Sequence, residues 1–260
     1  MVEAFFEPLG DGRFWATENT LGPWGGGSQH GGPPCALLGR ALERHEARDG
    51  MEVVRFTAEI LRPVPQAEVA VSVRTARGGR NVELLEATLA AADGTELVRA
   101  SAWRMNLQRD GFAAGDAGPP MPGPDQGAPH PFFDVGLETG YHTGMEWRFV
   151  EGAFLEPGPA KVWLRMRVPL VAGEAPTPLQ RVLCAADSGN GVSATADART
   201  LLFINTDLTV HLRRPLRGEW VGMDARTVIE ADGVGLAESV LHDTDGPIGR
   251  GAQALFVAPR

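Results

Sequence analysis

The chain repeats itself at a fixed interval, and this repeat restricts the folds open to it more than any other feature does. Pro63 and Pro215 are 152 positions apart, and the same offset relates many residues around them. The matched sets are Arg62 and Arg214, Arg74 and Arg226, Glu86 and Glu238, Leu89 and Leu241, Asp93-Gly94 and Asp245-Gly246, and Ala100 and Ala102 with Ala252 and Ala254. One ungapped offset over this stretch predicts two copies of a single structural unit.

A segment rich in proline and glycine separates the two copies. It runs from Gln108 to Pro131 and contains six prolines with glycines between them. Such a composition neither continues a helix nor fits the middle of a sheet, so it is typical of an extended linker. The sequence therefore predicts an N-terminal unit over 1–107, a linker over 108–131 and a C-terminal unit over 132–260.

Each copy has the pattern of a strand, a loop, one helix and a series of strands with alternating apolar and polar residues. The helices are expected near 33–48 and 177–186. The strands are expected near 13–18, 53–61, 69–77, 82–91 and 98–106, and again near 161–168, 203–212, 220–230, 235–242 and 249–257. Strands in series with one helix per copy predict an α+β fold, with an antiparallel sheet around each helix.

Charge and cysteine content exclude several classes of protein. The formal net charge of -9 argues against a nucleic-acid-binding protein, which needs basic surface to neutralise phosphates. The N-terminal residues lack the basic and apolar regions of a signal peptide, and no apolar run approaches the length of a membrane span, so we expect a cytoplasmic protein. Cys35 and Cys184 lie far apart in apolar segments and are expected to be free thiols. No Cys/His spacing typical of zinc, no GxSxG and no phosphate-binding glycine motif is present, and we expect no metal and no cofactor.

Three stretches, taken in order, resemble the double-hotdog acyl-CoA thioesterases of the acyl-CoA thioesterase II type. They are HGGPPCALLGRAL, then VVRFTAEILRPV, then the set AADSGNG, INTDLTVHLRRPLRGEW and DTDGPIGRGAQALF. The resemblance implies a double hotdog, with two tandem antiparallel sheets each wrapped around one central helix. It also implies hydrolysis of acyl thioesters in fatty acid metabolism, with acyl-CoA as substrate, and a homo-oligomer. An acyl chain on an acyl carrier protein is a further candidate substrate, and a non-catalytic acyl-thioester or lipid-binding protein is the alternative function.

The same resemblance implies a set of catalytic residues. In that family an Asp near the end of the second central helix, a Ser- or Thr-type residue on the next strand and a Gln on the last strand hold the attacking water. Asp187 and Gln253 match two of these positions. The strand position falls on Asn205, a departure from the family pattern, or on its neighbour Thr206. Successive strand residues face opposite sides of a sheet, so only one of the two can point at Asp187.

These residue types suit hydrolysis of a thioester. A carboxylate within hydrogen-bond reach can act as general base or nucleophile, while amides and hydroxyls orient water without titrating. Gly31 and Gly32 precede the first helix, where backbone N–H groups could stabilise an oxyanion. His30 and Arg214 are candidates for binding substrate, Arg214 through the CoA phosphates. A loop cap for His30 and a structural role for Arg214, which has a repeat equivalent, are the alternatives.

The two copies differ at the positions that the resemblance singles out. The repeat aligns Gln253 with Ser101, and matching of the helix prolines aligns Asp187 with Glu43. We interpret Glu43 as a solvated charge at a helix end. The sequence thus predicts one composite site, with oxyanion donors from the first copy and water-holding side chains from the second.

Overall fold

The secondary structure follows the predicted pattern, with additional short elements. The computed structural model describes residues 4–23, 27–107, 112–113, 115–130, 136–154, 156–195 and 200–259. Its strands are β1 (Phe6–Gly10), β2 (Arg13–Ala16), β3 (Met51–Ile60), β4 (Glu68–Arg77), β5 (Val82–Ala91), β6 (Glu96–Asn106), β7 (Ala128–Pro129), β8 (Met145–Glu151), β9 (Ala160–Met166), β10 (Leu201–Asn205), β11 (Asp207–Leu212), β12 (Val221–Ile229), β13 (Val234–Asp243) and β14 (Gly246–Pro259). Its helices are α1 (Gly32–Arg44), α2 (Tyr141–Gly144), α3 (Pro178–Ala186) and α4 (Gly189–Val192), with short 3-10 turns η1 (Glu18–Thr20) and η2 (Pro124–Gln126).

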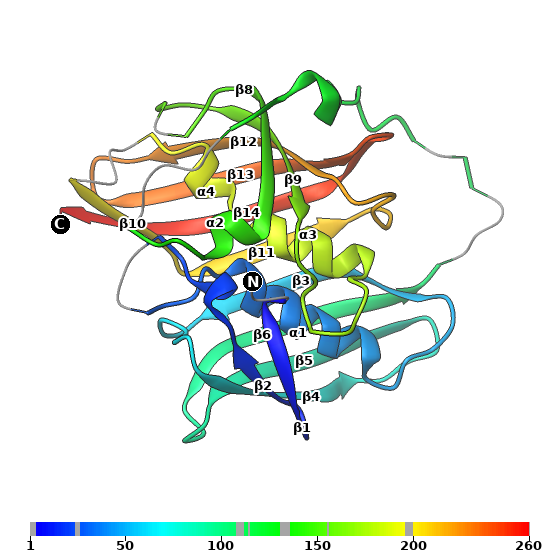
Figure 1. Ribbon diagram of the computed structural model, residues 1–260. Helices are drawn as coiled ribbons and strands as arrows, with labels where there is room; N and C mark the ends of the chain where they lie inside the picture. The colour runs from blue at the N-terminus through cyan, green and yellow to red at the C-terminus, as the bar shows by residue number, and fades with distance from the viewer. Residues whose placement is uncertain are drawn as a thin grey trace.

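The strands of both copies belong to one continuous antiparallel sheet. Its order is β1-β2-β4-β5-β6-β3-β11-β14-β13-β12-β9-β8-β7, and β10 also pairs with β14. Figure 1 shows the blue and cyan strands of the first half continuing into the yellow and red strands of the second. The two tandem antiparallel sheets that we expected are therefore joined edge to edge in one sheet. An edge strand leaves a row of N–H and C=O groups unpaired, and pairing β3 with β11 satisfies these groups in both halves.

The junction between β3 and β11 has two-fold symmetry. Thr57 lies opposite Thr209, which is its equivalent in the repeat, and the two hydroxyls are 3.3 Å apart. Phe56 correspondingly lies opposite Val210, and Ala58 opposite Leu208. The strand order on each side of this point is the same, since β2-β4-β5-β6-β3 repeats as β9-β12-β13-β14-β11. The duplication seen in the sequence is therefore an approximate two-fold axis through the sheet.

The two central helices pack directly against each other on one face of this sheet (Figure 1). Glycines of α1 permit the contact. A Cβ atom on Gly32 would lie 2.3 Å from the carbonyl oxygen of Cys184, and one on Gly39 would lie 2.5 Å from a methyl group of Leu183. The start of α1 thus contacts the end of α3, and no side chain fits between the two backbones there.

Part of the predicted linker belongs to the sheet of the second half. Within 108–131 the structure describes 112–113 and 115–130, while 108–111, 114 and 131 lie outside the described residues. The η2 turn is followed by β7, which pairs with β8. Trp163 donates a hydrogen bond of 2.7 Å from Nε1 to the carbonyl oxygen of Pro122, which ties this segment to β9. Within the described ranges, no helix combines the length and apolar composition needed to cross a membrane.

Candidate active site

Asp187 lies at the centre of a buried polar cluster at the end of α3. Its side chain is 4% exposed, and Oδ1 accepts hydrogen bonds from Nδ2 of Asn205 over 2.9 Å and from Nε2 of Gln253 over 3.2 Å. Oδ2 lies 3.1 Å from Nδ1 of His30. The structure therefore brings together four residues that are far apart in the chain, three from the second copy and one from the first.

The amide of Gln253 is held in one orientation by the backbone of α4. The backbone N–H of Asn190 donates to Oε1 over 3.1 Å, which leaves Nε2 to donate to the carbonyl and carboxylate oxygens of Asp187. A Cβ atom on Gly189 would lie 3.0 Å from Oε1, so the amide packs tightly against this glycine. Gln253 is 2% exposed, and the partners for its buried amide come from the stretch that carries Asp187.

A bulge between β10 and β11 selects Asn205 rather than Thr206. Four positions separate Asn205 from Thr209, whereas three separate their partners on β14, Leu255 and Ala252. Strict alternation from the buried Leu208 would turn residue 206 inward, and the additional residue turns Asn205 inward instead. Thr206 is exposed, and its hydroxyl lies near the carbonyl oxygen of Ala254, away from Asp187.

His30 connects the start of α1 to the carboxylate. Its Nδ1 lies 3.1 Å from the backbone nitrogen of Gly32 and 3.1 Å from Oδ2 of Asp187. A ring nitrogen has one bonding position, so Nδ1 accepts from Gly32 when it carries no hydrogen and donates to Asp187 when it carries one. Burial lowers the pKa of His30, and the Asp187 charge opposes that shift only in part. The imidazole is therefore neutral near pH 7.

The positive end of α1 faces the same carboxylate. A Cβ atom on Gly31 would lie 2.8 Å from Oδ2 of Asp187, so the backbone of the helix start is in contact with the acid. The N-terminus of a helix carries a partial positive charge that stabilises an anion. Gly31 and Gly32 lie at this helix start, beside the carboxylate of Asp187.

The sheet register changes the predicted equivalence of Gln253. Ser101 pairs with Thr57 and Glu86, and the residue that pairs with Thr209 and Glu238 is Ala252. The structural counterpart of Gln253 is therefore Ala102, because the chain from Glu238 to its partner Ala252 is one residue shorter than the chain from Glu86 to its partner Ser101. The counterpart of Asn205 is Val53, which precedes the same type of bulge in β3. The first copy thus has apolar side chains where the second has two amides.

The interpretation of Glu43 as a solvated charge was wrong. Its carboxylate accepts hydrogen bonds from Oγ1 of Thr177 over 2.8 Å and from Nε2 of Gln180 over 3.3 Å. Burial raises the pKa of Glu43, and these two hydrogen bonds oppose the rise. Glu43 thus contacts the start of α3, as Asp187 contacts the start of α1, but its hydrogen bonds run to the side chains of Thr177 and Gln180.

Arg214 lies apart from this cluster. Its guanidinium forms two hydrogen bonds to the carboxylate of Asp243, which is fully buried. Backbone N–H groups of Arg217 and Asp245 donate to the same carboxylate over 3.0 Å. Asp243 thus neutralises the charge of Arg214, which lies beyond the opposite end of β11 from Asn205. The geometry favours a structural role for Arg214 over contact with a phosphate.

Sequence reasoning missed Tyr141 and Ser188. The hydroxyl of Tyr141 donates to the carbonyl oxygen of Cys184 over 2.7 Å and lies 2.9 Å from Oγ of Ser188, while its ring stacks on His30 with the centroids 3.8 Å apart. Ser188 follows Asp187 directly, and Tyr141 is the one tyrosine in the sequence. Neither fact points to the contact, because it joins segments more than forty residues apart.

Neither cysteine is suited to act as a nucleophile. Burial raises the pKa of Cys35 and that of Cys184, and the negative charge of Asp187 raises both further. A thiol reacts as its thiolate, so both side chains remain unreactive thiols near pH 7. Among the described residues, no group of three or more His, Cys, Asp and Glu side chains is arranged to hold a metal ion.

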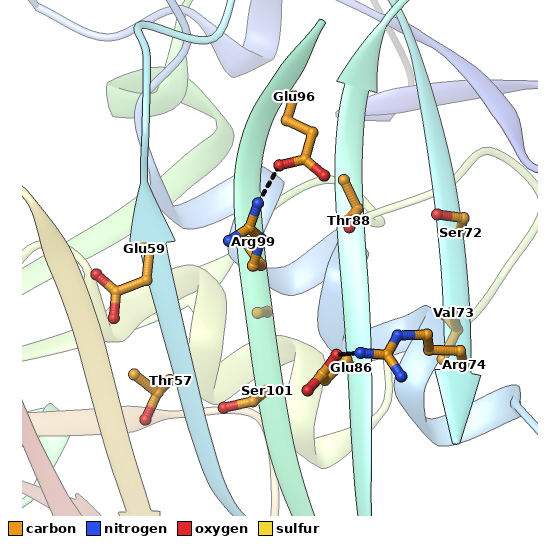
Figure 2. A pocket seen from close by; sticks show the side chains of 11 residues that line it. Thr57, Glu59, Ser72, Val73, Arg74, Glu86, Thr88, Glu96, Arg99 and Ser101 are labelled. Carbon is orange, nitrogen blue, oxygen red and sulfur yellow. Dashed lines mark hydrogen bonds and ion pairs between the residues drawn. The ribbon is translucent and has the colours of Figure 1, made fainter. Parts of the chain in front are cut away.

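A separate hollow lies on the opposite face of the first half of the sheet. Its volume is about 620 Å³, and Figure 2 shows it between β3, β4, β5 and β6. Its two arginines are already paired, Arg74 with Glu86 and Arg99 with Glu96. Because the lining residues alternate with the buried residues that face α1, this hollow does not communicate with Asp187 through the sheet.

Two domain families match the chain in sequence. Residues 20–105 match acyl-CoA thioesterase N-terminal domains, and residues 116–257 match acyl-CoA thioesterase C-terminal domains. A search of the curated proteins finds no match.

Solved structures show the same fold at low sequence identity. A Thermobifida fusca protein assigned as a thioesterase II has a TM-score of 0.75 at 18% identity, over 97% of this chain and 95% of its own. An Alicyclobacillus acidocaldarius protein with a hot dog fold has a TM-score of 0.75 at 15% identity, over 96% of this chain and 95% of its own. An acyl-CoA thioesterase II from Mycobacterium marinum has a TM-score of 0.68 at 17% identity, over 98% of this chain and 96% of its own. At these identities the likeness establishes the hotdog fold.

Proposed function

The chain belongs to the acyl-CoA thioesterase family and is a thioester hydrolase, and from this premise we propose that it hydrolyses acyl-CoA with a water activated by Asp187. The observation that carries the proposal is the contact of one buried carboxylate with Asn205, Gln253 and His30. Two amides that donate to a carboxylate fix its direction, and neither amide takes up a proton.

In this proposal Asp187 is the general base. The oxygen of water bonds to the thioester carbonyl carbon while its proton passes to the carboxylate. The C–S bond of the tetrahedral intermediate then breaks, and the leaving thiolate recovers that proton, which gives a carboxylic acid and free CoA. Asn205 and Gln253 orient the carboxylate and the water beside it, and neutral His30 shares the proton while Asp187 holds it.

The helix start supplies the second requirement of hydrolysis. Negative charge develops on the thioester oxygen, and backbone N–H groups at the positive end of α1 stabilise it. Gly31 and Gly32 bring this end within contact of Asp187 and the end of α3. The first copy thus provides the oxyanion donors and His30, and the second copy provides the base with its two amides.

The first copy is not expected to form a second site of this kind. Val53 and Ala102 occupy the positions of Asn205 and Gln253, and neither side chain can hold a carboxylate or a water. Glu43 is engaged with Thr177 and Gln180 instead. We therefore propose one active site per chain.

The proposal extends to a role in fatty acid metabolism and a homo-oligomer, which the family resemblance favours, and to the cytoplasmic location expected from the sequence. Light scattering on the purified protein measures the oligomeric state. Comparison of one acyl chain attached to CoA and to an acyl carrier protein tests the choice of thioester.

The decisive experiment measures thiol release from acyl-CoAs of increasing chain length by wild type, Asp187→Asn and Asp207→Asn. Removal of the general base is expected to lower kcat by about 100-fold or more. Asp207 accepts a hydrogen bond at Oδ1 from the backbone N–H of Ala254, which asparagine preserves, so this matched variant should keep its rate. Hydrolysis by Asp187→Asn at the wild-type rate would exclude the proposed site.

A further inference from the structure

Tyr141 contacts the proposed site from a segment that belongs to neither central helix. It begins α2, directly before β8, and the residue is 2% exposed. We propose that Tyr141 is a positioning residue for hydrolysis, which fixes the His30 ring and the last turn of α3 so that Asp187 keeps its contacts with both amides. This inference rests on the proposed role of Asp187.

The tyrosine hydroxyl anchors α3 on both sides of Asp187. It donates to the carbonyl oxygen of Cys184 over 2.7 Å and lies 2.9 Å from Oγ of Ser188. The last carbonyl groups of a helix lack hydrogen-bond donors within the helix. Tyr141 supplies a donor for one of them, the carbonyl of Cys184. Burial raises the pKa of Tyr141, so the hydroxyl keeps its hydrogen and stays a donor.

The tyrosine ring fixes the plane of the imidazole. The two rings are stacked, with an interplanar angle of 10° and centroids 3.8 Å apart. The backbone secures the same arrangement, since the N–H of His30 donates to Thr20 and the N–H of Tyr141 donates to the adjacent Leu21. Rotation of the imidazole would break the contacts of Nδ1 with Gly32 and Asp187, and the stacked ring opposes that rotation.

Two substitutions separate the hydroxyl from the ring. Tyr141→Phe removes the anchor at Cys184 and Ser188 and keeps the stacked ring, and it should lower kcat about tenfold. Tyr141→Leu removes both and should lower kcat about 100-fold. KM should change less than about twofold in both, because Tyr141 acts through groups that hold the water and not through the substrate.

A matched variant controls for the loss of a buried aromatic ring. Phe14 is 6% exposed, and its ring contacts are with Phe6 and Arg40 rather than with His30 or Tyr141. Phe14→Leu should lower the melting temperature and keep the wild-type kcat. Should Tyr141→Leu fail to fold, Tyr141→Phe still tests the hydroxyl, because its volume and ring are retained.

A readout independent of turnover is the titration of His30 followed by NMR. Burial is the main reason that the pKa of His30 is low, so exposure of the ring face in Tyr141→Leu should raise that pKa toward its ordinary value. The same titration should be unchanged in Phe14→Leu. Wild-type kcat and an unchanged His30 titration in both Tyr141 variants would overturn the inference.

The two proposals fail in different ways. If Asp187→Asn hydrolyses acyl-CoA at the wild-type rate, Asp187 is not the general base and the proposed mechanism is wrong. If Asp187→Asn is inactive while both Tyr141 variants turn over at the wild-type rate, only the positioning role of Tyr141 is lost.

Discussion

Asn205 donates a hydrogen bond of 2.9 Å from Nδ2 to Oδ1 of Asp187, and this contact depends on a bulge one residue further along the strand. Without the bulge, alternation would direct Thr206 toward the carboxylate. A bulge beside a functional site redirects a side chain that strict pairing would place on the other face. The same irregularity occurs in β3, where it turns Val53 inward. The bulge is therefore common to both copies, whereas the amide side chain is present only in the second.

Substitutions at these neighbours test which of them serves the site. Asn205→Ala is expected to lower kcat by about tenfold to 100-fold, because Asp187 loses a donor that fixes its direction. Thr206→Ala removes an exposed hydroxyl on the other face and should leave kcat and KM unchanged. Steady-state thiol release measures both, and a larger loss in Thr206→Ala than in Asn205→Ala would contradict the register.

Gln253 offers a test of the corrected repeat alignment. Gln253→Ala should lower kcat to a similar extent and destabilise the fold by about 1–3 kcal/mol, since the N–H of Asn190 and the carbonyl of Asp187 lose their buried partner. Ser101→Ala, at the position that the ungapped repeat equates with Gln253, removes a hydrogen bond with Arg55 and should not change turnover. Urea unfolding combined with kinetics separates the two effects.

Gly32 is predicted to be intolerant of any side chain. A Cβ atom there would lie 2.3 Å from the backbone oxygen of Cys184, so Gly32→Ala must push α1 away from α3 and displace Asp187. We expect a loss of about 1–3 kcal/mol in the free energy of unfolding, together with reduced activity. Gly191→Ala is the control, because nothing lies within 4 Å of a Cβ at that helical position. Equal stability of the two variants would show that the helices can separate freely.

The buried imidazole predicts how stability changes with pH. Burial lowers the folded-state pKa of His30 below its ordinary value of 6.5, so between these two pKa values the unfolded chain binds more protons. The free energy of unfolding should therefore fall as the pH drops through about 6.5 and level off below the folded-state pKa. His142 and His242 contribute in the same direction, because burial lowers the pKa of each.

Substitution of His30 isolates its share of this dependence. His30→Gln should give a shallower decline in stability below about pH 6.5 and a parallel curve above about pH 7.5. Urea unfolding at a series of pH values measures both slopes. An unchanged slope below pH 6.5 would mean that His30 titrates alike in the folded and unfolded chain.

The duplication, the Arg-Pro strands and the Asp-Gly turns could be predicted from the sequence because they are local. Alternation of side chains and turn residues at fixed spacing are properties of short segments, and they placed α1, α3 and most strands within a few residues. Asp187 and Gln253 were recognisable because the flanking residues of each resemble one family. The single amide in an otherwise small and apolar strand was itself an indication of buried partners.

Tertiary structure decided which residues meet. The choice of Asn205 over Thr206, and of Ala102 over Ser101 as the counterpart of Gln253, depends on one-residue shifts in pairing. Such a shift exchanges the two faces of a strand without changing its composition. The union of two sheets through Thr57 and Thr209, and the stacking of Tyr141 on His30, likewise join distant segments. Local sequence specifies the elements, and only packing of the whole chain fixes their register and hence the site.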